Sequence, residues 1–363
     1  MMILHSTPIV APSVGRSLHH LSRLREPRAL PGGSAPRWLR AAVWVGAALL
    51  AVVAPQARAE SMPDTISPPK GINLGSTSFF DGFGRTVEGW TLLEYNRYED
   101  LTRITDYDGK SSPLFKGTDI QVFVVQTQVS YTSNWHPFGG DGVGVSALLP
   151  VADFSSHFDQ NSPVKLSNNG FGVGDLNIGP FYQSAYVMDG ARPVFAWRAQ
   201  LSVVAPTGNV DGQRNINQGS GAWAINPFIA ITWVVLPQLE LSTRINYQYN
   251  TQTSRFDSPP PIPGLVYRNG QAGQMVFGNF DASYAVLPNA YVGVNGYALG
   301  ELTPDETNGQ VVAHSRETEM SIGPGGRYVF DESNALNVNM YLPVVARNTT
   351  SGLQFNTQFV HRF

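Results

Sequence analysis

Apolar and polar residues alternate with a period of two along much of the chain after residue 60. In residues 239–250, LELSTRINYQYN, apolar side chains share one face and polar or charged side chains share the other. The final residues repeat the pattern, with Leu353, Phe355 and Phe359 on one face. This alternation predicts β-strands, because successive side chains of a strand point to opposite faces. No segment of this region has the pattern of a long amphipathic helix.

The pattern predicts about twelve strands, and each is long enough for a tilted strand to cross a bilayer core, which takes about 9–11 residues. Two of them, residues 118–131 and 141–154, are apolar on both faces, so the pattern does not assign their inward side. The expected strands cover residues 89–99, 118–131, 141–154, 171–186, 193–207, 222–234, 238–251, 273–286, 289–302, 316–330, 334–346 and 350–363.

Short and long connections alternate between these strands. Tight links follow every second strand, as at 236–237, 287–288 and 331–333. The last outer link, near 347–349, is an exception, because it is short where a long link is expected. The other links are long and polar and span residues 100–117, 155–170, 208–221, 252–272 and 303–315. Outer-membrane barrels have this asymmetry, with short periplasmic turns and long outer loops. We therefore predict an all-β fold, a transmembrane antiparallel up-and-down β-barrel of about 12 strands, whose closure leaves no unpaired edge in lipid.

The composition agrees with such a fold. Hydrophobic residues make up 42% of the 363 residues and charged residues only 14%, so most of the polarity comes from uncharged side chains. This balance is typical of chains with many short strands and turns. The chain contains no cysteine, which excludes disulfides, thiolate nucleophiles and thiolate metal sites.

The N-terminus has the features of a secretory signal peptide. An arginine-rich stretch up to Arg40 precedes an apolar run at 41–54, and Ala57-Arg58-Ala59 follows as a cleavage pattern. The run is too short to span a bilayer, which disfavours the alternative of a retained membrane anchor.

We therefore divide the chain into three parts. Residues 1–59 form a cleaved signal peptide with its basic lead-in, residues 60–88 an N-terminal periplasmic or lumen-plugging segment, and residues 89–363 the barrel. Removing residues 1–59 takes away seven of the 24 basic and one of the 27 acidic residues, leaving 17 basic and 26 acidic. This net negative charge argues against a nucleic-acid partner.

The sequence offers no support for an enzyme, a metal site or a cofactor. Four histidines follow the predicted cleavage site, namely His136, His157, His314 and His361, and none has a metal-ligand spacing such as H-E-x-x-H. His314 and Ser315 are adjacent, so on a strand their side chains would point in opposite directions and not form a catalytic pair.

Eight charged residues are candidates for the barrel lumen. A mixed-sign cluster of this kind would orient a phenolate or carboxylate during its passage, with the arginines as counterions. Alternatively, the charges pair with one another and hold the wall rigid, since buried charges require partners. The candidates are Asp175, Arg198, Glu240, Arg244, Asp281, Glu317, Glu319 and Arg327.

A second candidate is the stretch GSTSFFDGFG at residues 75–84, before the first strand. It could fold into the lumen, where Phe79, Phe80 and Phe83 would form an aromatic constriction and Asp81 would bond to the wall. The alternative is a periplasmic tail whose phenylalanines pad the lower rim of the barrel.

Several stretches resemble the family named for the meta-pathway of phenol degradation. They are PPKGINLGSTSFFDGFG at 68–84, FGVGDLNIGPFYQ at 171–183, VVAPTGNVDGQRNINQGSGAWAINPF at 203–228, NGYALGELTPDETNGQ at 295–310 and SIGPGGRY at 321–328. The resemblance covers nearly all of the chain after the signal peptide. It implies an outer-membrane barrel whose partners are membrane lipid and small aromatic or hydrophobic substrates. It also implies that Phe359 and Phe363 form the terminal signal for the barrel-assembly machinery.

The resulting functional hypothesis is a channel or transporter of the bacterial outer membrane for passive uptake of small hydrophobic or phenol-like compounds. The alternative is a non-transporting structural or adhesive barrel that acts through its outer loops, particularly residues 252–272.

Overall fold

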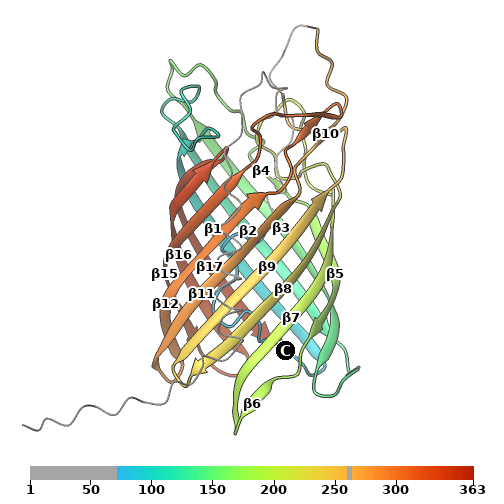
Figure 1. Ribbon diagram of the computed structural model, residues 1–363, viewed down its shortest axis with the longest axis vertical. Coiled ribbons are helices and arrows are strands. Elements are labelled where there is room, and N and C mark those ends of the chain that lie inside the picture. Colours follow the sequence, from blue (N-terminus) through green and yellow to red (C-terminus); the bar gives the residue numbers. More distant parts are fainter. Residues whose placement is uncertain (1–71, 260–263) are drawn as a thin grey trace, which may run out of the picture. The chain divides into compact units, whose positions relative to one another are not determined.

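The computed structural model describes residues 72–259 and 264–363, so the predicted signal peptide lies outside the described residues. Twelve strands of the described part form a closed antiparallel barrel (Figure 1). They are β1 (Gly89–Ile104), β2 (Asp119–Thr132), β3 (Gly142–His157), β5 (Leu176–Gln183), β7 (Arg192–Ala205), β8 (Ala224–Leu236), β9 (Leu239–Asn250), β11 (Met275–Leu287), β12 (Ala290–Glu301), β15 (Thr318–Val329), β16 (Asn334–Arg347) and β17 (Thr350–Arg362).

The barrel closes between its first and last strands. β1 pairs with β17, with Tyr95 opposite Gln358, and it also pairs with β2 on its other side. Each remaining barrel strand pairs with its neighbours in chain order, which is the up-and-down topology predicted from the sequence. The predicted fold class is therefore confirmed. No helix in the described part of the chain is long and apolar enough to cross a membrane.

One predicted strand, residues 171–186, is interrupted, and this part of the prediction is wrong. The structure has β4 (Phe171–Val173) and β5 in its place, separated at Gly174 and Asp175. Gly174 donates its backbone N–H to Pro150 O over 2.8 Å, and the Asp175 carboxylate accepts bonds from the outer loops. The contacts of Asp175 with the outer loops interrupt the strand at a point where the alternating sequence pattern predicts that it continues.

The remaining short strands lie outside the barrel ladder. β6 (Val187–Asp189) extends the turn before β7 at the lower end of Figure 1. β10 (Gly270–Gln271), β13 (Glu306–Thr307) and β14 (Gln310–Val311) form a separate three-stranded sheet. This sheet links two long loops at the upper end, where the sequence placed long polar connections.

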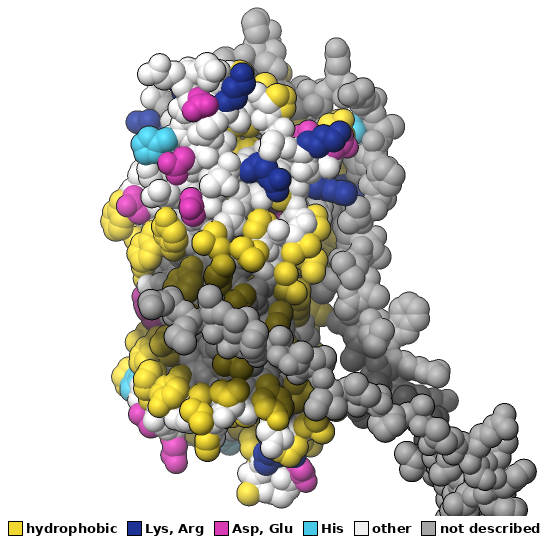
Figure 2. Space-filling model, turned by 90° about the vertical axis from the view of Figure 1, so that its left-hand side faces the viewer, with side chains coloured by type: hydrophobic (Ala, Val, Ile, Leu, Met, Phe, Trp, Pro, Cys, Tyr) yellow, Lys and Arg dark blue, Asp and Glu magenta, His cyan; other side chains and the backbone are white. Residues whose placement is uncertain are grey.

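The outer face of the barrel is apolar and its inner face is polar. Side chains of β9 alternate as predicted, with exposed Leu241 and Tyr249 outside and buried Glu240, Ser242 and Asn246 inside. Figure 2 shows hydrophobic side chains gathered over the middle and lower parts of one face, with charged side chains near its upper end. An apolar belt around a polar interior is the arrangement that a barrel needs in lipid.

The inward face of β2 is apolar near its outer end, whereas the inward faces of strands such as β9 are polar. Ile120, Val122 and Val124 are buried inside the barrel near its outer end, whereas Phe123 between them is exposed on the outer face. The inward residues form one cluster with Leu101 of β1 and other apolar side chains. The sequence could not assign these faces because both are apolar.

Candidate functional site in the barrel lumen

Residues 72–85, which we call the luminal segment, run through the interior of the barrel (Figure 1). Half of its residues are buried and the others are half-buried, and Phe79 is only 1% exposed. A backbone inside a barrel has no strand partners of its own. Its N–H and C=O groups therefore need side-chain partners from the wall or water.

Amide and hydroxyl side chains of the wall supply these partners in the upper half of the segment. Asn279 Oδ1 accepts the N–H of Gly75 over 2.9 Å. The Gly75 carbonyl accepts from Asn356 Nδ2 over 2.7 Å and from the Tyr341 hydroxyl over 2.9 Å. Gln354 Nε2 donates to the carbonyl of Leu74 over 3.0 Å. Four wall side chains thus hold two consecutive peptide groups.

The lower half is held in the same way. Phe80 N–H donates to Glu240 Oε1 over 3.0 Å, and Gly82 N–H donates to Thr232 Oγ1 over 2.8 Å. Gln183 donates to the Gly82 carbonyl over 2.9 Å. A Cβ atom on Gly82 would overlap the Thr232 backbone nitrogen, so the segment lies directly on the wall at this point.

Asp81 forms an ion pair with the wall. Its two carboxylate oxygens accept from Nε and Nη2 of Arg244, each over 2.7 Å, and the side chains are only 10% and 11% exposed. Such a bidentate pair is stronger and more directional than a neutral hydrogen bond. The structure therefore places Asp81 and Arg244, both candidates from the sequence, in one contact that fastens the segment.

The phenylalanines of the segment pack against the lower wall. Phe80 makes an edge contact with Tyr291 at 4.8 Å between ring centroids, and Phe83 makes one with Tyr186 at 5.2 Å. Phe80 also has a left-handed backbone with φ of 64°. A non-glycine residue in this conformation costs about 1–2 kcal/mol, so the contacts of the segment hold a strained residue in place.

Arg198 and Arg327 lie beside the same part of the segment and line one cavity with Asp81 and Arg244. Arg198 donates to Gln200 Oε1 over 3.0 Å and stacks over a wall phenylalanine at 3.7 Å. Arg327 donates to an asparagine of β16 over 3.1 Å and stacks over the Phe80 ring at 5.3 Å. The structure thus gathers all three candidate arginines around one carboxylate.

The candidate acids lie at several levels of the lumen, and Glu240 among them accepts the N–H of Phe80. Asp175 accepts from backbone groups of the outer loops at 2.7 and 2.9 Å. Glu319 accepts the Tyr297 hydroxyl over 2.7 Å. Asp281 is buried in the wall on β11, and Glu317 lines the outer end of the lumen. The lumen thus holds charges of both signs, and the role of these acids in orienting a substrate stays a prediction.

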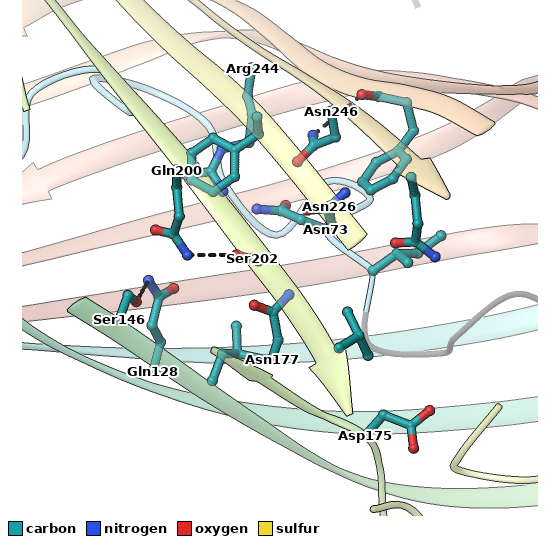
Figure 3. A pocket seen from close by; sticks show the side chains of 16 residues that line it. Asn73, Gln128, Ser146, Asp175, Asn177, Gln200, Ser202, Asn226, Arg244 and Asn246 are labelled. Carbon is teal, nitrogen blue, oxygen red and sulfur yellow. Dashed lines mark hydrogen bonds between the residues drawn. The ribbon is translucent and has the colours of Figure 1, made fainter. Parts of the chain in front are cut away.

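The spaces that the described residues line beside the segment are small. A cavity of about 50 Å³ lies between the segment and the wall (Figure 3), where Asn73 and Arg244 face Gln128, Gln200 and other amides. The arginine-lined cavity below measures about 70 Å³, and a third cavity near Glu319 about 50 Å³. A cavity of about 150 Å³ accommodates benzene in another protein. None of these three spaces holds an aromatic ring.

Two larger spaces adjoin the lumen. One, which we call the outer vestibule, measures about 250 Å³ and lies at the outer ends of β1, β2 and β12. The other is an open hollow of about 650 Å³ in the wall, at Pro180 of β5, Leu201 of β7 and Pro227 of β8. This hollow shares Gln200 and Phe228 with the small cavity beside the segment.

The residues that hold the segment were largely missed by the sequence reasoning. The candidates were chosen for their charge, whereas most contacts come from neutral side chains such as Asn279, Gln354 and Asn356. The available signal was the repeated asparagine and glutamine at inward strand positions. Within the described residues, no group of three or more histidine, aspartate or glutamate side chains is placed to hold a metal ion.

A family model described as "Putative MetA-pathway of phenol degradation" matches residues 102–359. Among solved structures, an outer membrane channel from Pseudomonas putida F1 is similar over 79% of this chain and 100% of that chain, with a TM-score of 0.65 and 14% identity. No curated protein matches the chain.

Two other solved structures are more distant. The transport unit of the autotransporter AIDA-I from Escherichia coli is similar over 78% of this chain and 92% of that chain, with 9% identity and a TM-score of 0.44. A mutant of TodX described as a monoaromatic hydrocarbon channel is similar over 82% of this chain and 99% of that chain, with 11% identity and a TM-score of 0.38. At 14% identity, the Pseudomonas structure shows a shared barrel fold.

Proposed function

The chain belongs to the family whose description is "Putative MetA-pathway of phenol degradation". We propose that it is a channel of the bacterial outer membrane for passive uptake of small hydrophobic or phenol-like compounds. The observation that carries the proposal is a closed barrel with an apolar outer belt and a polar lumen that opens to an outer vestibule. Its partners would be outer-membrane lipid and small aromatic molecules. No catalytic step is part of the proposal.

Passage through the lumen requires the luminal segment to move. The spaces beside it measure about 50 to 70 Å³ and are too small for an aromatic ring. The wall side chains that bond the segment are amides, hydroxyls and charged groups, which water can solvate once the segment leaves. Relief of the left-handed backbone at Phe80 also favours displacement. We propose that the segment, including Phe79, Phe80, Asp81 and Phe83, is a removable plug.

Flux into liposomes tests the proposal. Purified full-length protein in vesicles should speed entry of phenol and p-cresol over vesicles without protein, and the rate should follow the concentration gradient. Equal entry rates in the two kinds of vesicle would contradict it.

The second candidate is a non-transporting barrel, structural or adhesive, that acts through its outer loops. It is favoured by one observation, the close fit of the luminal segment in the barrel. It predicts that loss of the gene leaves growth on aromatic compounds unchanged, whereas a channel predicts slower growth at low substrate concentration.

The last strand would also carry the signal for barrel assembly. Phe355 faces outward and Phe363 ends the chain 68% exposed, with its N–H bonded to Trp90 O over 3.1 Å. We propose that Phe359 and Phe363 are recognised by the barrel-assembly machinery. Deleting Phe363 should lower the amount of folded protein in the outer membrane several-fold, because it removes the terminal aromatic ring, which is 68% exposed and contacts the His361 ring at 4.4 Å between centroids.

Heat-modifiable mobility of membrane fractions on gels measures that amount. Phe330→Ala is the matched control, because it removes a phenylalanine ring from a turn, where the ring is 54% exposed. Normal insertion of the Phe363 deletion, or an equal loss in the control, would contradict the assignment.

A further inference from the structure

The outer vestibule is the only one of the described lumen spaces large enough for an aromatic ring. Its volume of about 250 Å³ exceeds the about 150 Å³ that accommodates benzene elsewhere. The spaces beneath it are several times smaller while the luminal segment is in place. A substrate arriving from outside would therefore stop here first.

One side of the vestibule is apolar. Leu101, Ile120, Val122 and Phe154 line it, and they belong to a single buried cluster. Ile216 of an outer loop packs against this cluster and lines the same space. These side chains offer a ring an apolar surface away from water.

The other side is acidic. Glu99, Glu301, Asp305 and Glu317 line it together with one basic side chain, Arg97. Arg97 Nε lies 3.1 Å from Glu99 Oε1, so its charge is already paired. The lining therefore carries four carboxylates against one guanidinium.

Backbone contacts fix two of these carboxylates. Glu301 Oε2 accepts the N–H of Glu317 over 2.8 Å, and Asp305 Oδ1 accepts the N–H of Gly273 over 2.6 Å. Both acids are buried, at 2% and 4% exposure. A carboxylate can accept several hydrogen bonds, and here Glu301 and Asp305 are held in the same space as the apolar side chains.

We propose that the outer vestibule binds a small uncharged aromatic molecule with a hydroxyl or amino donor, and that it rejects aromatic carboxylates. The ring would lie on the Val122 side, and the donor would point to the acidic side. A hydrogen bond from such a donor to a carboxylate is roughly twice as strong as a hydrogen bond between two neutral groups. A benzoate would bring a further negative charge to a surface whose one guanidinium is paired. The inference rests on the proposed uptake function and names the substrate class for it.

Equilibrium binding to the full-length protein in detergent micelles tests the proposal. p-Cresol should bind about tenfold or more tightly than benzoate and than toluene, which lacks the donor. Val122→Trp fills the vestibule and should weaken p-cresol binding by about tenfold or more. Phe123→Trp is the matched control. It introduces the same tryptophan side chain one residue away, on the outer face, and should leave p-cresol binding unchanged.

A second variant covers the case in which Val122→Trp does not fold. Glu317→Lys should weaken p-cresol binding and strengthen benzoate binding. The preference for p-cresol over benzoate, measured as the ratio of their affinities, should become smaller or reverse. Equal affinity for benzoate and p-cresol in the unaltered protein, or unchanged ratios in Glu317→Lys, would overturn the proposal. Flux into liposomes separates this inference from the uptake function: flux without selective binding contradicts only the vestibule site, and selective binding without flux contradicts only the channel.

Discussion

Deletion of residues 72–85 should raise the ion conductance of the reconstituted barrel by about tenfold or more, because a barrel of this size encloses a passage once nothing fills it. The luminal segment makes contacts all along the wall and leaves only small spaces beside it. Its removal exposes amides and charged groups that water solvates readily, so the barrel itself should stay folded. Planar-bilayer recordings measure the conductance, and heat-modifiable gel mobility checks the fold.

A matched control for this deletion is replacement of residues 72–85 by a glycine-serine segment of equal length. It keeps the chain length but removes every side-chain contact, so it should also raise conductance. If the deletion leaves conductance at the level of the unaltered protein while the barrel is folded, the segment does not close the lumen, and the alternative of a tail that pads the rim is favoured.

Asp81→Asn should raise the fraction of time that the channel is open by roughly a hundredfold. The change leaves the Arg244 guanidinium without its carboxylate in a place where both side chains are about nine-tenths buried. Breaking a buried pair by removing one partner costs about 3–5 kcal/mol, and the amide still accepts one bond, so the lower end of this range applies. A cost of about 3 kcal/mol shifts an equilibrium about a hundredfold. Single-channel recordings measure the open fraction.

Two further variants sharpen the test of this ion pair. The charge swap Asp81→Arg with Arg244→Asp restores a pair and should lower the open fraction towards that of the unaltered protein. Asp281→Asn removes a buried wall carboxylate that has no hydrogen bond to the segment, and it should change little. An open fraction in Asp81→Asn equal to that of the Asp281 control would show that the pair does not fasten the segment.

The strands could be predicted from the sequence because the barrel imposes one simple rule on them. Lipid outside and a polar lumen inside require alternation, and the residues of β9 and β17 follow it almost without exception. The pattern failed at Gly174 and Asp175, where hydrogen bonds to the outer loops end the strand. Contacts of this kind join residues far apart in the sequence, so they leave no local signal.

The candidate site could be predicted only in part. The sequence singled out Asp81 and Arg244 separately, but nothing in their spacing of 163 residues indicates that they meet. The path of the luminal segment depends on which inward side chains match its peptide groups, and Asn356 and Tyr341 have the same alternation signal as any other inward residue. The outer vestibule was missed because its apolar side comes from β2, whose two faces look alike in sequence.

The central claim is that substrate passes only when the luminal segment leaves its place, and a reversible crosslink tests it most directly. The chain has no cysteine, so Ser78→Cys with Asn339→Cys introduces a single pair at a site where Asn339 Nδ2 and Ser78 Oγ lie 3.0 Å apart. We expect oxidised protein in liposomes to lose its p-cresol flux and reduced protein to regain it, with each single-cysteine variant unaffected. Full flux through the oxidised protein would contradict the claim and would direct attention to the hollow in the wall at Pro180 and Pro227.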